Sequence, residues 1–340
     1  MKLRFFHIGL LALMLAGCGR QRLQQLTSDA DDANQRHDYE HAIADYTEVI
    51  RIAPQFEPAY TARAGDYVVL GKYDLALDDL KLALQLNPTN FLAYQLRGGA
   101  FYGRREYDKA IGDFDLSLEY QADNTNGVNG FEIKGESFKL RGMASYRLGL
   151  VTNAIADLNE AEKYLPGDYV IYEIRGYCYD SRVNADKCLK DFNKAIELNP
   201  ADVTALYGRA GVYSQTGSCM DAIQDFEKVI RLRPQAVGAY NLLAWLLATC
   251  PDDALRDGKR AVELATRACD MSQWTNYAYV DTLAAAYAET GDFDSAVKYQ
   301  KQAAGMTDVP ADNRTNVQNR IELYLKHEPY RKSKTFKEYD

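Results

Sequence analysis

Residue types that commonly carry out catalysis are few and scattered in this sequence. Of the four histidines, His7 lies in an apolar N-terminal segment and His327 lies near the C-terminus. His37 and His41 are four residues apart, a spacing that lets two imidazoles share a metal ion, but His37 falls in a predicted turn and no third ligand is evident. No glycine-rich phosphate loop, Gly-x-Ser-x-Gly or His-Glu-x-x-His motif occurs. We therefore expect no enzymatic activity, no metal and no cofactor.

The N-terminus carries a different kind of chemistry. Lys2 and Arg4 precede an apolar run from Phe5 to Ala16, which is too short to span a bilayer as a helix. The following residues, Leu15-Ala16-Gly17-Cys18, resemble the bacterial lipobox, in which the leader is cut before the cysteine and the cysteine is diacylated. This resemblance implies a signal peptide over residues 1–17, a lipid on Cys18 and a short tether over residues 18–22. An ordinary secretory leader or a short N-terminal anchor is the alternative.

The lipobox resemblance also implies a cellular location. Two or three acyl chains hold a soluble domain firmly on a membrane, since each buried methylene contributes about 0.8 kcal/mol. Gly19 follows the cysteine where aspartate would retain the protein in the inner membrane of enterobacteria. We therefore expect the outer membrane, facing the periplasm, in a bacterium with two membranes.

Small residues recur along the chain at a nearly constant interval. Successive members are separated by 34, 34, 44, 34, 34, 39 and 35 residues, and they are Ala42, Ala76, Ala110, Ala154, Cys188, Ala222, Ala261 and Ala296. A second small column stands twelve positions earlier, at Ala30, Ala64, Gly98, Gly142, Gly176 and Ala210. Two antiparallel helices approach closely only where side chains are small. The spacing therefore predicts a solenoid of helix pairs.

This pattern resembles the tetratricopeptide repeat. With the alanine column at position 20, proline recurs at position 32, where it ends the second helix, as Pro54, Pro88, Pro166, Pro200 and Pro234. Large side chains fill position 24 as Tyr46, Leu80, Phe114, Leu158, Phe192 and Phe226. The resemblance implies an all-α right-handed superhelix of about eight helix-turn-helix repeats over residues 23–310. The units are 23–56, 57–90, 91–124, 135–168, 169–202, 203–236, 237–275 and 276–310.

Two insertions and the C-terminus depart from the repeat. Residues 125–134 contain two Asn-Gly pairs and predict a solvent loop, whereas Pro251 to Asp257 predict a short extended connection. Val317, Ile321 and Tyr324 are spaced for a final amphipathic helix, so residues 311–340 predict a capping helix followed by a basic tail. We expect the tail itself to be solvated and disordered.

Charge forms two matched columns. Position 7 is arginine and position 23 is aspartate in five consecutive units, as Arg63, Arg97, Arg141, Arg175 and Arg209 with Asp79, Asp113, Asp157, Asp191 and Asp225. Both columns end together in the last two units, which indicates that the residues touch. If the residues pair within a unit, Asp45 has no arginine partner. If they pair between neighbouring units, Asp225 has none. We favour a partly buried, structural ion-pair ladder over a row of ligand-binding arginines.

Five cysteines remain besides Cys18, an odd number that cannot pair completely in an oxidising compartment. Cys178 and Cys188 belong to the two helices of one unit and should lie side by side near their turn, so a disulfide between them is a hypothesis. The alternative is two buried thiols, with Cys188 replacing an alanine.

The tetratricopeptide resemblance implies that binding uses a concave surface built from positions 2, 5, 9, 12 and 13 of each first helix. These positions include Gln95, Tyr102, Lys139, Met143, Tyr146, Arg147, Glu173, Tyr177, Tyr207, Asn241 and Trp245. The aromatic and polar mixture suits extended peptides or sugars.

Composition limits the partners. The net charge of −8 becomes about −10 when the leader is removed with its two positive residues, which argues against nucleic acid. The favoured function is a membrane-anchored, non-catalytic scaffold for protein partners of unknown identity. The alternatives are a lipoprotein that handles a glycan, either an exported polysaccharide or peptidoglycan, and a structural lipoprotein that forms homodimers.

Overall fold

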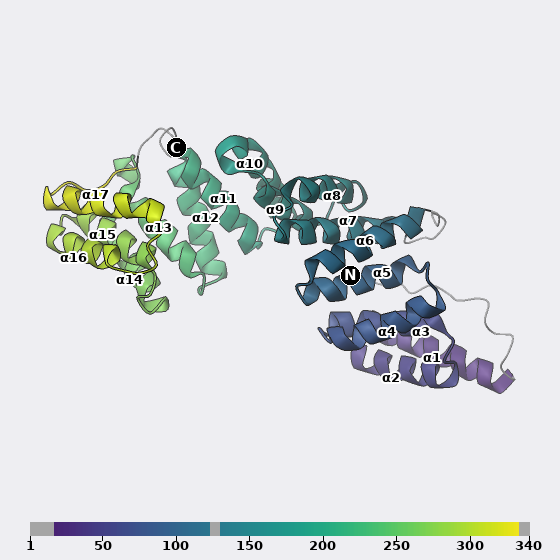
Figure 1. The fold of residues 1–340 in the computed structure, drawn as a ribbon. Helices are drawn as coiled ribbons and strands as arrows, with labels where there is room; N and C mark the ends of the chain where they lie inside the picture. Colours follow the sequence, from purple (N-terminus) through teal and green to yellow (C-terminus); the bar gives the residue numbers. More distant parts are fainter. Residues whose placement is uncertain (1–16, 123–129, 333–340) are drawn as a thin grey trace. The chain divides into compact units, whose positions relative to one another are not determined.

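The computed structural model describes residues 17–122 and 130–332 (Figure 1). Within these ranges the chain has seventeen α-helices, two short 3-10 helices and no β-strand. The α-helices are α1 (Gly17–Gln35), α2 (Tyr39–Ile52), α3 (Glu57–Val69), α4 (Tyr73–Leu86), α5 (Phe91–Gly103), α6 (Tyr107–Ala122), α7 (Gly130–Arg147), α8 (Val151–Tyr164), α9 (Tyr169–Cys178), α10 (Ser181–Leu198), α11 (Val203–Thr216), α12 (Cys219–Leu232), α13 (Val237–Thr249), α14 (Gly258–Met271), α15 (Tyr277–Thr290), α16 (Phe293–Ala304) and α17 (Arg314–Leu325). The fold is therefore the expected all-α solenoid.

The chain divides into two compact units, residues 1–174 and residues 175–340, and each is considered by itself. In the first unit α1 packs on α2, α3 on α4, α5 on α6 and α7 on α8; in the second unit α11 packs on α12, α13 on α14 and α15 on α16. The first helices of successive pairs also touch, since α3 contacts α5, α5 contacts α7 and α13 contacts α15. We call the surface that these odd-numbered helices share the first-helix face.

The small residues predicted to lie between helices are indeed buried. Every alanine of the main column is fully buried, and Cys188 is 1% exposed. The large side chains at position 24 fill the space beside them. A methyl group on Gly98 would come within 2.7 Å of the Phe114 ring, so close approach of α5 and α6 requires glycine at this position.

A row of tyrosines joins successive repeats, which the sequence pattern did not predict. Each hydroxyl donates a hydrogen bond to the carbonyl of the proline that ends the preceding repeat, at 3.0–3.3 Å, in the pairs Tyr60–Pro54, Tyr94–Pro88, Tyr172–Pro166 and Tyr240–Pro234. The proline column thus has two roles. It ends a helix, and its carbonyl oxygen holds the next first helix.

Three segments differ from their predictions. The expected tether at residues 18–22 belongs to α1, because Leu23 and Leu26 pack on the first core cluster and extend the helix backwards. Residues 130–134 of the expected loop form the first turn of α7, while residues 123–129 lie outside the described ranges. Residues 253–255 form a 3-10 helix rather than an extended connection, because the Asp252 side chain accepts the Ala254 N–H.

The C-terminus agrees with its prediction only in part. Helix α17 packs on α16 as a cap, and the 3-10 helix Ala311–Asn313 precedes it. The tail after it does not start in solvent, since residues 329–332 are partly buried against the second unit. The predicted signal peptide, except Gly17, lies outside the described residues. Of the helices that are described, none is long and apolar enough to cross a bilayer.

Candidate functional site

The arginine and aspartate columns meet within each repeat. In all five pairs the guanidinium Nε and Nη2 atoms donate to the two carboxylate oxygens at 2.6–3.0 Å, as in Arg63–Asp79, Arg97–Asp113, Arg141–Asp157, Arg175–Asp191 and Arg209–Asp225. Such paired, charge-assisted bonds have a fixed geometry. The structure therefore decides the alternative that the sequence left open, in favour of pairing within the unit.

Arg63 and Arg209 also reach the repeat before them. The Nη1 atom of Arg63 donates to Thr47 Oγ1 at 2.8 Å, and that of Arg209 donates to Asn193 Oδ1 at 2.7 Å. Each acceptor lies on the second helix of the preceding repeat. Because one planar guanidinium binds two repeats, the ladder sets how they stack, and its atoms are occupied within the protein rather than offered to a ligand.

On the first-helix face of the first unit, several predicted binding residues serve the fold. Gln95 is 5% exposed, and its Nε2 donates to the Ile133 carbonyl at 2.9 Å and to Ser137 Oγ at 3.2 Å. The Lys139 ammonium lies 2.8 Å from Glu136 and 2.6 Å from Asp168. Burial alone would lower the pKa of Lys139, but these two carboxylates outweigh burial and raise it. Gln95 and Lys139 thus join structural elements, contrary to the prediction.

The rest of this face is more accessible. Arg147 is exposed at the end of α7, and a hydrogen bond with Tyr102 raises its pKa. The Tyr102 ring contacts Tyr107 edge to face, with 5.4 Å between centroids. Met143, Tyr146 and Glu173 are each partly exposed. This end of α7 therefore presents one cationic and several amphipathic side chains to a partner.

In the second unit, the predicted tyrosines pack against neighbouring helices. The Tyr177 hydroxyl donates to the Thr204 carbonyl at 2.7 Å, and its ring contacts Phe192 edge to face. Tyr207 packs in the same way on Phe226, and burial raises the pKa of Tyr207. Asn241 is 9% exposed, and its Oδ1 atom has no hydrogen-bond partner. A buried acceptor of this kind is costly unless a donor reaches it.

Trp245 is covered by the chain's own C-terminal segment. The Tyr330 ring lies 5.6 Å from the Trp245 ring. Beyond it, the Lys332 N–H donates to the Thr249 carbonyl at 3.0 Å, and Lys332 Nζ donates to the Ser214 carbonyl at 2.6 Å. We call residues 328–332, which have no regular secondary structure, the C-terminal strap. An extended segment of protein therefore already lies across the predicted binding surface.

Comparisons with known proteins bear on the repeat itself. Models of the tetratricopeptide repeat match residues 61–126 and residues 280–308, one stretch in each unit. The chain contains tetratricopeptide repeats. No curated protein matches the sequence.

Several solved structures share the fold. PilF of Pseudomonas aeruginosa superimposes with a TM-score of 0.58 at 14% identity over 67% of this chain and 99% of that one. A chain of the Cut9–Hcn1 complex gives 0.55 at 15% identity over 88% of this chain and 55% of that one. A tetratricopeptide protein of Parabacteroides merdae gives 0.48 at 17% identity, over 90% and 99%. At 14% and 15% identity, the first two likenesses show the fold alone.

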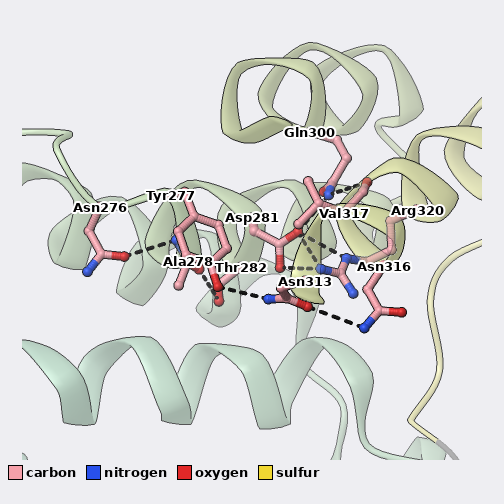
Figure 2. A network of polar contacts seen from close by, with 10 residues as sticks. All are labelled: Asn276, Tyr277, Ala278, Asp281, Thr282, Gln300, Asn313, Asn316, Val317 and Arg320. Atoms are coloured by element: carbon pink, nitrogen blue, oxygen red, sulfur yellow. Dashed lines mark hydrogen bonds and ion pairs between the residues drawn. The ribbon is translucent and has the colours of Figure 1, made fainter. Parts of the chain in front are cut away.

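The last tetratricopeptide repeat replaces the ladder with a contact to the cap. Asp281 on α15 is 6% exposed, and Arg320 of α17 donates to both of its oxygens at 2.8–3.0 Å (Figure 2). Gln300 of α16 donates to Asp281 at 2.6 Å and to the Val317 carbonyl at 3.0 Å (Figure 2). Arg320 also lies over the rings of Trp245 and Tyr330, 5.6 and 5.5 Å from their centroids. One arginine thus connects the cap, the last repeat and the C-terminal strap.

The five described cysteines are free thiols and all are buried. The bridge hypothesised between Cys178 and Cys188 is not formed in the structure, where Cys188 Sγ instead lies 3.5 Å from the Tyr179 carbonyl. Burial raises the pKa of Cys178 to about 12 and that of Cys188 to about 11. Such thiols are unreactive at neutral pH and act as small apolar side chains of the tetratricopeptide core.

Proposed function

We propose that this protein is a non-catalytic tetratricopeptide scaffold that binds extended segments of partner proteins on its first-helix face. One observation carries the proposal: the C-terminal strap, a segment without regular secondary structure, lies on this face between Trp245 and the ends of the first helices. It is held through a backbone N–H as well as through side chains. Backbone hydrogen bonds are available to any peptide and absent from a sugar chain, which favours a protein partner over a glycan.

The partner surface in the first unit is the accessible end of α7. Arg147 is exposed there, with Met143 and Tyr146 on the same helix. Aromatic and arginine side chains contribute much of the binding energy in protein interfaces because they combine large contact area with polar groups. The ion-pair ladder keeps these helices in register, so the surface is formed before a partner arrives.

Photo-crosslinking in the native cell tests this function. A photoreactive phenylalanine at Arg147 should capture a discrete protein that mass spectrometry identifies. The matched control is the same amino acid at Ala156, an exposed position on α8 of the same repeat. Adducts that collapse on glycosidase treatment would move the assignment to polysaccharide, and adducts of the chain with itself alone would indicate a structural dimer. Equal capture at both positions would contradict a specific binding face.

We also propose that Cys18 carries a lipid that anchors the scaffold to the cell envelope, with the outer membrane facing the periplasm as its address. The lipobox-like residues 15–18 support this proposal. Because α1 begins at Gly17, a lipid on Cys18 would hold the first repeat close to the membrane surface. Only the N-terminal repeat would then be restrained by the bilayer, and later repeats would extend toward partners.

Loss of the anchor is expected when Cys18 is replaced. In Cys18→Ser the protein should fail to incorporate a clickable palmitate analogue and should move from the membrane pellet to the soluble fraction, because the thiol is the only atom of that side chain that accepts the lipid. Cys219→Ser, a buried cysteine, is the control and should keep both label and pellet. Labelling of Cys18→Ser at the wild-type level would exclude this anchor.

A further inference from the structure

The C-terminal strap occupies the positions where first helices of this repeat type bind ligands. It touches Trp245, Ser214 and Thr249, which stand at positions 9, 12 and 13 of their units. The segment is not a regular continuation of the fold. It leaves α17 through His327, which has a left-handed φ of 62°, and turns back over α13 and α11.

Tyr330, Arg331 and Lys332 make contacts that an unrelated peptide could reproduce. The Tyr330 ring packs on Trp245 and beside the small residues Ala284 and Ala288 of α15. Arg331 forms an ion pair with Glu289 at 2.5 Å, and Lys332 binds through both its backbone and its ammonium group. The surface thus binds one aromatic residue followed by two basic residues.

The charge of the surface explains the preference for basic side chains. Helices α11, α13 and α15 all present their C-terminal ends here, through Ser214, Thr249 and Glu289. The last carbonyls of a helix have no partner within it, and the helix dipole places about half a negative charge at that end. Glu289 adds a full negative charge that is only 13% exposed and that also binds Arg256. These helix ends and Glu289 favour a cation at Arg331, whereas burial lowers the pKa of Lys332.

The strap is held weakly enough to be displaced. The Arg331 side chain remains 35% exposed, so water partly screens its ion pair with Glu289. Its main advantage is its covalent connection to α17, which gives it an effective concentration on the order of millimolar. A partner segment with the same chemistry and a few more contacts can therefore compete with it.

We propose that the C-terminal strap is an internal competitor at a peptide site in the second unit, and that the external ligand is an extended protein segment with an aromatic residue followed by two basic residues. The inference rests on the proposed scaffold function and names the partner chemistry of one part of its face. In the resting protein the strap covers Trp245. Binding of the partner releases it.

A competition experiment with the full chain tests the proposal. The probe is a fluorescent peptide with the sequence of residues 327–335, and binding is followed by anisotropy. The strap variant Tyr330→Ala/Arg331→Ala should bind the probe at least tenfold more tightly than the wild type, because its own strap no longer competes. A probe with alanine in place of the same two residues should bind neither protein. Adding Glu289→Gln to the strap variant should weaken the probe at least fivefold.

Every other result overturns the proposal. If the wild type and the strap variant bind the probe with equal affinity, the strap does not cover the site. If neither protein binds the probe, the strap only stabilises the position of α17. If the protein forms a dimer at high concentration and the probe dissociates this dimer, the site binds the strap of a second copy. If the double variant loses its melting transition, Lys332→Ala replaces it, since it removes the ammonium bond to Ser214 and keeps the backbone bond to Thr249. Crosslinking at Arg147 does not involve the strap. It therefore tests the scaffold function independently of the competition experiment.

Discussion

Replacing Arg175 with leucine is expected to lower the free energy of unfolding of the second unit by about 3–5 kcal/mol. The Arg175 side chain is 7% exposed and that of Asp191 is 4% exposed, so water reaches neither. Leucine would fill the space but leave a buried carboxylate without a cation. The cost arises from that unpaired charge, because a buried ion pair is worth much less than the penalty for breaking it.

Two matched variants separate this cause from loss of packing. In Arg97→Leu the loss should be smaller, about 1–2 kcal/mol, because the Arg97 side chain is 27% exposed and water can approach Asp113 once the arginine is gone. The double variant Arg175→Leu/Asp191→Leu should regain most of the lost stability, since no charge remains buried. Urea denaturation followed by circular dichroism measures all three. A double variant as unstable as Arg175→Leu would contradict the explanation by charge.

Replacing Asp66 with asparagine is expected to stabilise the first unit at neutral pH by about 2–4 kcal/mol. Asp66 is 2% exposed and its Oδ2 atom has no hydrogen-bond partner. Burial raises the pKa of Asp66 to about 7, a hydrogen bond from Asn34 opposes this, and the charge of Asp31 adds to it. Asparagine keeps the shape and the oxygen that Asn34 contacts, but it carries no charge into the core.

The pH dependence of unfolding tests whether folded Asp66 is protonated. Unfolded Asp66 loses its proton near its ordinary pKa of 3.8, whereas folded Asp66 keeps it up to about pH 7. The wild type should therefore lose stability steadily as the pH rises from about 4 to 7, and that loss should be complete above pH 7. In Asp66→Asn this slope should disappear. Asp74→Asn, at a side chain that is 87% exposed, should leave it unchanged. Parallel curves for the wild type and Asp66→Asn would show that Asp66 is ionised in the folded protein.

The arginine–aspartate pairs repeat along the chain, and such features are readable from sequence, whereas the buried Asp66 carboxylate occurs once and is not. In a solenoid each unit contacts mainly its neighbours, so the same packing problem recurs every 34 residues or so and is solved by the same residue types. The buried alanines, the glycine facing Phe114 and the arginine–aspartate columns follow from this periodicity. The partner of each arginine was ambiguous only because two neighbouring units offer the same acceptor.

Places where the period is interrupted were predicted less well. Residues 130–134 were expected to be a loop because of their glycines, yet they extend α7 by a turn whose Ile133 carbonyl accepts a hydrogen bond from Gln95. Gln95, which its repeat position places on the predicted binding surface, instead fixes α5 to α7. A local turn signal does not reveal that a backbone carbonyl one repeat away needs a donor.

By itself, the sequence determined the all-α repeat fold and the small and large residues that pack within a repeat, since these depend on short separations that recur. Only the tertiary structure decided that the C-terminal strap lies on the first-helix face. Lys332 bonds to Ser214 across 118 residues, and Tyr330 meets Trp245 through a contact that occurs once. A contact that occurs once leaves no periodic signal. It forms because three helix ends with unpaired carbonyls lie side by side only after the repeats have stacked, and a basic segment then satisfies them.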